Sequence, residues 1–445
     1  MGPAIPRALV PVLVLLLASA GLGIAWFLPN FFWLFLMVVL GGATLLLALA
    51  CPVPACVFWL FAIGLTPDMW AGDLLGAGTA VAIVAALKVS GLVLVALAMA
   101  RYGPAWDGFN PGFAFAAMFC AGLLHGLHPN LDLAESVRTL LGSIAPFAFG
   151  FVRLPRSWSR AVIGAVLCMP LASVLLGAGL AAAGLRPLLV EGAGLRLQGA
   201  GHPAFLGGFA LTAACAALLE LLRTGRARYL AWLLLNLMIL LLSGARAPLA
   251  VAVGVIGLAL LLAPAPAFPW PRRIPLLLGG AIAALGLLAL ADTLGTIRIF
   301  TLLGGDAENL SGRDAIWPLF QAAWDASPWW GWGVGAGKML IAPETPLARL
   351  LGTTAAHNEY LRIGVDGGSI GLALLVVFFL LWAISHLRAL HGADRWVMVL
   401  VLLGFAVHSA TDNTLIATTS SVLFAWIIAV FARAAAAPFV PETSA

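Results

Sequence analysis

A polar cluster, AHNEYLR at positions 356–362, directly precedes a long apolar run and contains the residues best suited to chemistry. His357 is the candidate catalytic group, because a neutral imidazole can accept a proton near pH 7. Asn358 and Glu359 follow it directly in the chain. A lone histidine is more often structural, so its neighbours in space must decide between the two roles.

Two arginines could bind a phosphorylated substrate. Arg246 occupies SGARAPLA, a tight connection between apolar runs, where an arginine is often only an anchor at the membrane surface. Arg313 lies in the first turn of an expected helix, where the helix dipole disfavours a cation. Paired arginines bind phosphates bidentately. A base together with this pair therefore indicates glycosyl or phosphoryl transfer from a diphosphate-linked donor.

The elements that must position these residues are membrane helices. The chain has 445 residues, of which 63% are hydrophobic and only 9% charged, and its mean hydropathy is +1.07. A soluble protein would have about a quarter of its residues charged, and a transmembrane helix needs about 20 apolar residues. We expect an all-α polytopic membrane protein that forms a single membrane domain over residues 1–445, with 12–14 transmembrane helices.

Apolar runs define fourteen candidate spans. They are 8–28, 31–49, 54–66, 78–100, 110–127, 136–153, 161–184, 204–222, 229–244, 247–264, 274–292, 367–387, 396–411 and 415–432. Thirteen arginines fall in one set of alternate loops and most acidic residues in the other set. The positive-inside rule then predicts that both termini are cytoplasmic.

This layout predicts that Arg246, Arg313 and His357 share the outer side, where an arginine is unusual. It also predicts a long outer loop over residues 293–366, with five tryptophans and short helices lying against the outer face. Such long loops are usually functional or disordered, and this composition argues against disorder. Trp317 and Trp330 either belong to an interfacial aromatic belt or stack on sugar rings.

Other polar residues carry weaker signals. Lys88, inside an expected span, must face the bundle or a cavity, but the sequence names no partner for it. His408 and Asp412 lie near the outer face and could border a site. His125 and His128 have a spacing that could bind a metal, but no acidic ligand shares their helical register.

The sequence therefore predicts no metal and no cofactor. The glycine-rich GWGVGAGK stretch lacks the spacing of a nucleotide-binding phosphate loop. We also find no nucleic-acid-binding pattern, so the expected partners are membrane lipids and the substrates.

Three stretches, in this order, resemble the O-antigen ligase and polymerase superfamily of bacterial envelope enzymes. They are SGARAPLA, SGRDAIWPLFQAAWDASPWWGWGVGAGK and AHNEYLRIGVDGGSIGLALL, and the resemblance covers roughly residues 200–430. It implies an inverting, metal-independent glycosyltransferase in the bacterial inner membrane, with its active site facing the periplasm. The donor would be a glycan on undecaprenyl diphosphate. By this resemblance Arg246 and Arg313 bind the diphosphate, and His357 activates the acceptor hydroxyl. Asn358 and Glu359 would then orient this base or contact a sugar.

Three functions remain open at this point. A ligase would move a finished glycan onto lipid A–core, whereas a polymerase would extend an O-antigen or exopolysaccharide chain from the same donor. A membrane transporter is the third hypothesis. It would place charged residues and broken helices near the bilayer midplane, but the polar residues of this chain gather on one face. The ligase is the favoured prediction.

Overall fold

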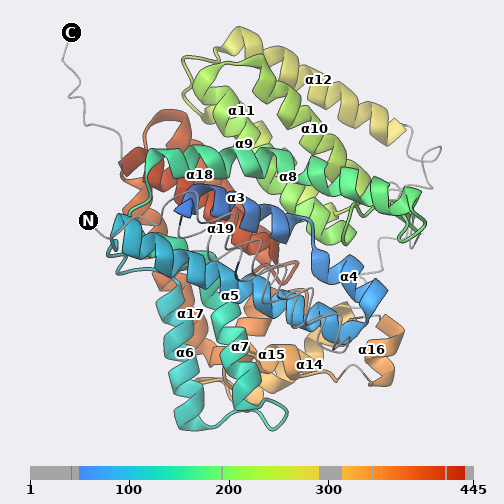
Figure 1. Ribbon diagram of the computed structural model, residues 1–445, viewed down its shortest axis with the longest axis vertical. Coiled ribbons are helices and arrows are strands. Elements are labelled where there is room, and N and C mark those ends of the chain that lie inside the picture. Colours follow the sequence, from blue (N-terminus) through green and yellow to red (C-terminus); the bar gives the residue numbers. More distant parts are fainter. Residues whose placement is uncertain are drawn as a thin grey trace.

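The computed structural model describes residue 42 and residues 50–289 and 313–435, apart from 192–193, 343, 352 and 416–417. The described part is almost entirely helical (Figure 1). The helices are α3 (Pro52–Gly64), α4 (Pro67–Leu75), α5 (Ala77–Tyr102), α6 (Gly112–His125), α7 (Leu133–Ile144), the 3₁₀ helix η2 (Ala145–Phe151), α8 (Arg156–Ala182), α9 (Pro203–Thr224), α10 (Ala227–Ser243), α11 (Arg246–Leu262), α12 (Trp270–Ala289), α14 (Arg313–Ala326), α15 (Ala336–Met339), α16 (Pro346–Leu351), α17 (Glu359–Leu387), α18 (Gly392–Ser409) and α19 (Thr418–Ala435). Strands β1 (Leu189–Val190) and β2 (Arg196–Leu197) form one short antiparallel ribbon. The predicted all-α fold is confirmed.

Six described helices are long and apolar enough to cross a membrane: α5, α8, α9, α17, α18 and α19. They coincide with the predicted spans at 78–100, 161–184, 204–222, 367–387, 396–411 and 415–432. A seventh span is formed if α3 and α4, which are bent by 54° relative to each other, count as one. Helices α6, α10 and α11 are shorter apolar helices at three further predicted spans. The predicted spans 8–28 and 31–49 lie outside the described residues.

One predicted span, 136–153, is divided in the structure. Helix α7 covers its first part and the 3₁₀ helix η2 the second. Pro146 stands at the beginning of η2, where its missing N–H cannot continue the α-helical hydrogen bonds. Helix α7 itself is amphipathic, with Glu135 in its first turn. The apolar composition of residues 136–153 suggested one span, but the segment forms two elements with different surroundings.

Helix α9 lies at the centre of the bundle, and 89% of the residues in its most apolar stretch are buried. It packs against α8, α10, α11, α18 and α19 (Figure 1). Its alanines at 213, 214, 216 and 217 are fully buried or nearly so. Small side chains at these positions allow neighbouring helices to approach closely, which is how membrane helices gain packing energy.

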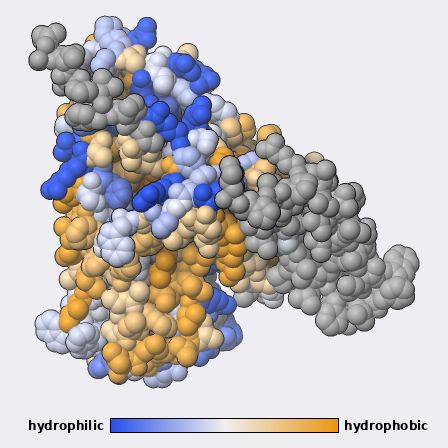
Figure 2. Space-filling view, turned by 60° about the vertical axis from the view of Figure 1, so that its left-hand side comes forward, coloured by the Kyte–Doolittle hydropathy of each residue, from blue (hydrophilic) through white to orange (hydrophobic). Residues whose placement is uncertain are grey.

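The surface of the bundle suits a lipid environment. One face of the molecule carries a broad hydrophobic area, with most hydrophilic side chains of that face gathered beside it (Figure 2). Long apolar side chains such as Leu175, Val253 and Leu403 are 60% or more exposed. Exposed apolar area on this scale marks contact with a membrane or a partner. The helices and this surface together indicate a multi-pass membrane protein.

Helix ends that the charge pattern assigns to the inner side meet each other. Arg433 at the end of α19 pairs with Glu220 near the end of α9, and it lies 3.3 Å from Asp394 at the start of α18. Arg223 lies 3.5 Å from the same Asp394 carboxylate. Three helices therefore bring their predicted inner ends together in one ionic network.

Segments assigned to the outer side meet at the opposite ends of these helices. Arg186, after α8, donates to Asp73 in α4 at 2.7 Å and to the carbonyl of Gly201, before α9, at 2.8 Å. The candidate residues Arg246 and His357 belong to this set of helix ends.

Candidate active site at the start of helix α17

His357 lies in an unusual backbone conformation one residue before α17 is capped. Its φ is +49°, and Thr66 is the only other described residue besides glycine with a positive φ. Asn358 is the N-cap of α17, and its side-chain oxygen accepts from the N–H groups of Tyr360 at 3.0 Å and Leu361 at 3.2 Å. Such a conformation costs energy and persists where the surroundings enforce it, often at functional sites.

Both ring nitrogens of His357 have partners. Nδ1 lies 3.2 Å from Oδ1 of Asp412, and Nε2 lies 3.2 Å from Oγ1 of Thr353. A carboxylate only accepts, so Nδ1 carries the hydrogen and Nε2 is the free base. The Thr353 hydroxyl then donates to Nε2, while its oxygen accepts from the N–H of Ala355 at 3.1 Å. This arrangement fixes one tautomer, with the basic nitrogen held against a hydroxyl group.

Both side chains are accessible, and the carboxylate of Asp412 is ionised. The side chains of His357 and Asp412 are 34% and 38% exposed, so a substrate hydroxyl can reach them. Burial acts to raise the pKa of Asp412, but the hydrogen bond with His357 and the charge of His408 outweigh it and lower this pKa. The carboxylate is therefore negative at neutral pH and stabilises a positive charge on His357.

Helix α18 holds Asp412 next to His357. The Tyr360 hydroxyl donates to the carbonyl of Ala406 at 2.8 Å, which joins the first turn of α17 to the last turn of α18. His408, one turn before Asp412, places its Nε2 3.8 Å from Oδ2 of that carboxylate. The sequence placed His408 and Asp412 near the outer face but gave no sign that Asp412 pairs with His357.

Glu359 is buried and does not face the exposed side of His357. It is 2% exposed and accepts from Arg362, which also donates to Asp366 at 2.6 Å; all three residues are buried. A buried cation between two carboxylates is neutralised by its partners. Asn358 and Glu359 thus make their described side-chain contacts within the first turns of α17.

The glycine-rich stretch packs against α17 where the helix is broken. Gly368 has φ +62° inside α17, and loop backbone replaces the lost helical bonds. Trp332 N–H donates to the Val365 carbonyl at 2.9 Å, and Ser369 N–H donates to the Pro328 carbonyl at 2.8 Å. A Cβ at Gly331 would lie within 2.6 Å of α17 backbone atoms. These glycines allow two backbones to approach closely.

Helix α14 brings Arg313 to the same region. The indole N–H of Trp317 donates to the carbonyl of Ala356 at 2.8 Å, directly beside His357. Arg313 is the first residue of α14, one helical turn or about 6 Å before Trp317. Trp330 lies in the loop after α14 and is 47% exposed.

Arg246 begins α11 and is exposed. Gly404 in α18 lies against Val251 and Val255, and Gly392, where α18 begins, lies near Pro264, beyond the end of α11. The two helices therefore run in opposite directions. The first turn of α11 lies beside the end of α18, close to the turn that contains Asp412.

The structure thus gathers the three principal predicted residues at one end of the bundle. Sequence reasoning missed Thr353 and the pairing of Asp412. His125 and His128, whose spacing was only a weak metal signal, belong to no group of three metal-ligating side chains among the residues that the structure describes. His128 instead accepts from the N–H of Asn130 at 3.2 Å and packs its ring against Trp332.

Comparison with known families supports this location. Residues 230–376 match the family model described as O-antigen ligase. The matched region contains Arg246, Arg313 and His357, and it ends before Asp412. The predicted resemblance to the O-antigen ligase and polymerase superfamily is confirmed over this part of the chain. A search of curated proteins found no match.

Proposed function

We propose that this chain, whose residues 230–376 match the O-antigen ligase family, transfers a glycan from undecaprenyl diphosphate to an acceptor hydroxyl. The family match implies a glycosyltransferase-type enzyme with a lipid-linked glycan as donor. The main support for this reaction is the His357–Asp412 pair. It lies at the same end of the bundle as the first residues of α11 and α14, Arg246 and Arg313.

The proposed step is a direct displacement. The acceptor oxygen attacks the anomeric carbon and passes its proton to Nε2 of His357. The bond from that carbon to the diphosphate oxygen breaks on the opposite face, and its electrons remain on the lipid diphosphate. Configuration at the anomeric carbon is inverted. In this scheme the acceptor hydroxyl takes the place of the Thr353 hydroxyl, which now lies 3.2 Å from Nε2.

The arginines act on the leaving group. Negative charge grows on the diphosphate as the bond breaks, and Arg246 and Arg313 stabilise that charge. Removal of one such donor typically costs about 3–4 kcal/mol of transition-state stabilisation. Because two guanidinium groups supply the positive charge, we propose that transfer requires no metal. The exposed Trp330 and the half-buried Trp317 are proposed sugar contacts of the loop over residues 293–366.

Asp412 is a positioning residue in this scheme. It keeps the hydrogen of His357 on Nδ1 and stabilises the imidazolium that forms after proton transfer. Its hydrogen bond with His357 and the anchoring of α18 by Tyr360 support this role.

The proposed environment is the bacterial inner membrane, with both termini cytoplasmic and the site facing the periplasm. The ionic network of Arg433, Glu220 and Asp394 and the site at the opposite helix ends support that orientation.

We propose a ligase that uses lipid A–core as acceptor, since the matched family model is described as O-antigen ligase. An O-antigen or exopolysaccharide polymerase is the alternative, because it uses the same leaving group and needs the same base. The test is transfer by purified protein in vesicles, with undecaprenyl diphosphate-linked glycan supplied with or without lipid A–core. Product that forms only when lipid A–core is present, and that is attached to it, supports the ligase. Chain growth with donor alone contradicts it and identifies a polymerase.

A further inference from the structure

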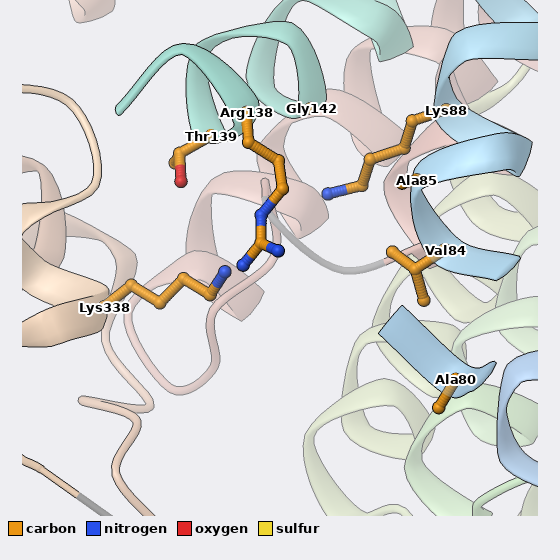
Figure 3. Close-up of a pocket in the computed structure, with 8 residues that line it drawn as sticks. All are labelled: Ala80, Val84, Ala85, Lys88, Arg138, Thr139, Gly142 and Lys338. Carbon is orange, nitrogen blue, oxygen red and sulfur yellow. The ribbon is translucent and has the colours of Figure 1, made fainter. Parts of the chain in front are cut away.

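A cavity of about 260 Å³ lies between α5, α7 and α15, apart from the His357 site. Its lining is formed by Ala80, Val84, Ala85, Lys88, Arg138, Thr139, Gly142 and Lys338. The three cationic side chains come from three different elements, and their charged ends point into one shared space (Figure 3).

The cavity has an excess of positive charge. Glu135 pairs with Arg138 and accepts from Lys338 at 2.7 Å. These contacts outweigh the effect of burial and lower the pKa of Glu135, so it is ionised. Three cations against this one carboxylate leave a net charge of +2. Within the described residues, the Lys88 ammonium has no hydrogen-bond or ion-pair partner.

The site for Lys88 is built into the packing. Lys88 lies near the middle of α5, which has the length and hydropathy of a membrane span. A Cβ at position 142 would lie only 2.6 Å from its Nζ, so Gly142 provides the space for the ammonium group. A cation at this depth is costly, and such residues usually mark a binding site or pathway.

The rest of the cavity lining indicates what kind of ligand would fit. Ala80, Val84 and Ala85 form an apolar surface on the same membrane helix as Lys88. The volume is below the roughly 300–1,000 Å³ of pockets for drug-sized ligands, so it suits a small charged group and not a glycan. An anion on an apolar stem, such as the phosphate of a lipid headgroup, matches both the charges and the wall.

The cavity is distinct from the place where transfer is proposed. Gly337, next to Lys338, donates its N–H to Asp366 at 2.8 Å. Asp366 lies seven residues after Glu359, the first residue of α17, which is about 10 Å along the helix. None of His357, Thr353 and Asp412 is among the residues that line the cavity, so its three cations lie outside the His357 site.

We propose that Lys88, Arg138 and Lys338 form a second phosphate-binding site, which holds the phosphate of a lipid headgroup. It is separate from the Arg246 and Arg313 pair and does not require the proposed transfer reaction. The same chemistry would also accept a free phosphate compound, so the source is decided by experiment.

The test measures binding by calorimetry in uncharged detergent, in an Arg246→Ala background that weakens the proposed donor site. Dihexanoyl phosphatidic acid is the lipid probe, inorganic pyrophosphate the free probe and dihexanoyl phosphatidylcholine the neutral control. Lys88→Gln and Arg138→Gln should each lower affinity for phosphatidic acid about tenfold or more. Arg101→Gln, which removes an exposed charge at the other end of α5, should leave it unchanged.

The two probes identify the source. A loss for phosphatidic acid alone supports a lipid headgroup, and a loss for both probes supports recognition of the phosphate group itself. Unchanged affinity for both probes in Lys88→Gln and Arg138→Gln overturns the proposal, and so does equal binding of phosphatidylcholine. The thermal midpoint gives an independent readout. Lys88→Gln should not lower it, because no protein partner is lost; a lower midpoint with unchanged binding would show a structural lysine.

Discussion

Nδ1 of His357 and Oδ1 of Asp412 lie 3.2 Å apart, although the two residues are 55 positions apart in the chain. One precedes α17 and the other follows α18, so packing of these two helices creates the pair. The proposed reaction depends on it, because the carboxylate fixes which imidazole nitrogen is basic.

Asp412→Asn should lower kcat with little change in KM for either substrate. Asparagine keeps the size of the side chain but removes the charge, and it allows the other histidine tautomer. Loss of the corresponding carboxylate in serine proteases costs about 10⁴-fold, and we expect a fall of about 10²–10⁴-fold here. Initial rates in vesicles measure it.

The matched control for Asp412→Asn is Asp325→Asn, on the exposed face of α14. This control should retain the parent rate. A parental kcat in Asp412→Asn would contradict the proposed role of Asp412 in positioning His357.

Arg246→Lys and Arg313→Lys should each lower kcat/KM for the lipid-diphosphate donor about 10²–10³-fold, the cost of one transition-state donor. Lysine keeps the charge but lacks the planar fork that binds two phosphate oxygens. Donor titrations at saturating acceptor measure the effect. Arg101→Lys, at the opposite end of the bundle, provides the control. Donor kinetics equal to those of the parent in Arg246→Lys and Arg313→Lys, as in the control, would contradict the proposed binding of the diphosphate by these two arginines.

Stability should depend on the ionisation of Asp412. Its pKa is lowered in the folded protein, so the stabilising contribution is present above the unfolded value of about 3.9. It is lost as pH falls through the lower folded value. The thermal midpoint of the parent should therefore exceed that of Asp412→Asn at neutral pH, and the difference should shrink below about pH 4. A difference that grows on acidification would reverse the assigned direction.

Gly368→Ala should destabilise the protein. The residue has φ +62°, and an added Cβ would lie 2.4 Å from the backbone of Trp329. Strain and displacement of the 328–333 loop should cost about 1–3 kcal/mol. Gly164→Ala in α8 is the matched control, since its Cβ would meet no atom within 4 Å, and helix propensity favours alanine. Differential scanning fluorimetry should show a lower midpoint for the first variant only.

Most helices were predictable from the sequence because they coincide with apolar runs, six of which form helices long enough to span a membrane. The described spans from 78–100 to 415–432 match helices for this reason. The region 136–153 differs, since a count of apolar residues does not register the charged face of α7 or the effect of Pro146. The role of the glycine-rich stretch could not be predicted either. Its partner is the backbone of α17 at the break around Gly368, which the sequence alone does not reveal.

The candidate site was partly predictable. His357, Arg246 and Arg313 stand out because they are polar residues at the ends of apolar runs on one predicted side. Pairing of His357 with Asp412 depends on the contact of Tyr360 with Ala406, and no local spacing encodes it. Lys88 was conspicuous in an apolar run, but its cavity is formed by Gly142 and by a residue 250 positions later, Lys338.

The most direct test of the central claim is the transfer rate of His357→Ala in reconstituted vesicles with undecaprenyl diphosphate-linked glycan and acceptor. His391→Ala, at the exposed start of α18 on the predicted inner side, is the matched control. The account predicts that His357→Ala keeps the parental thermal midpoint within a few degrees and loses transfer by at least about 10²–10⁴-fold, while His391→Ala keeps both. Near-parental transfer by folded His357→Ala would contradict the assignment of His357 as the base.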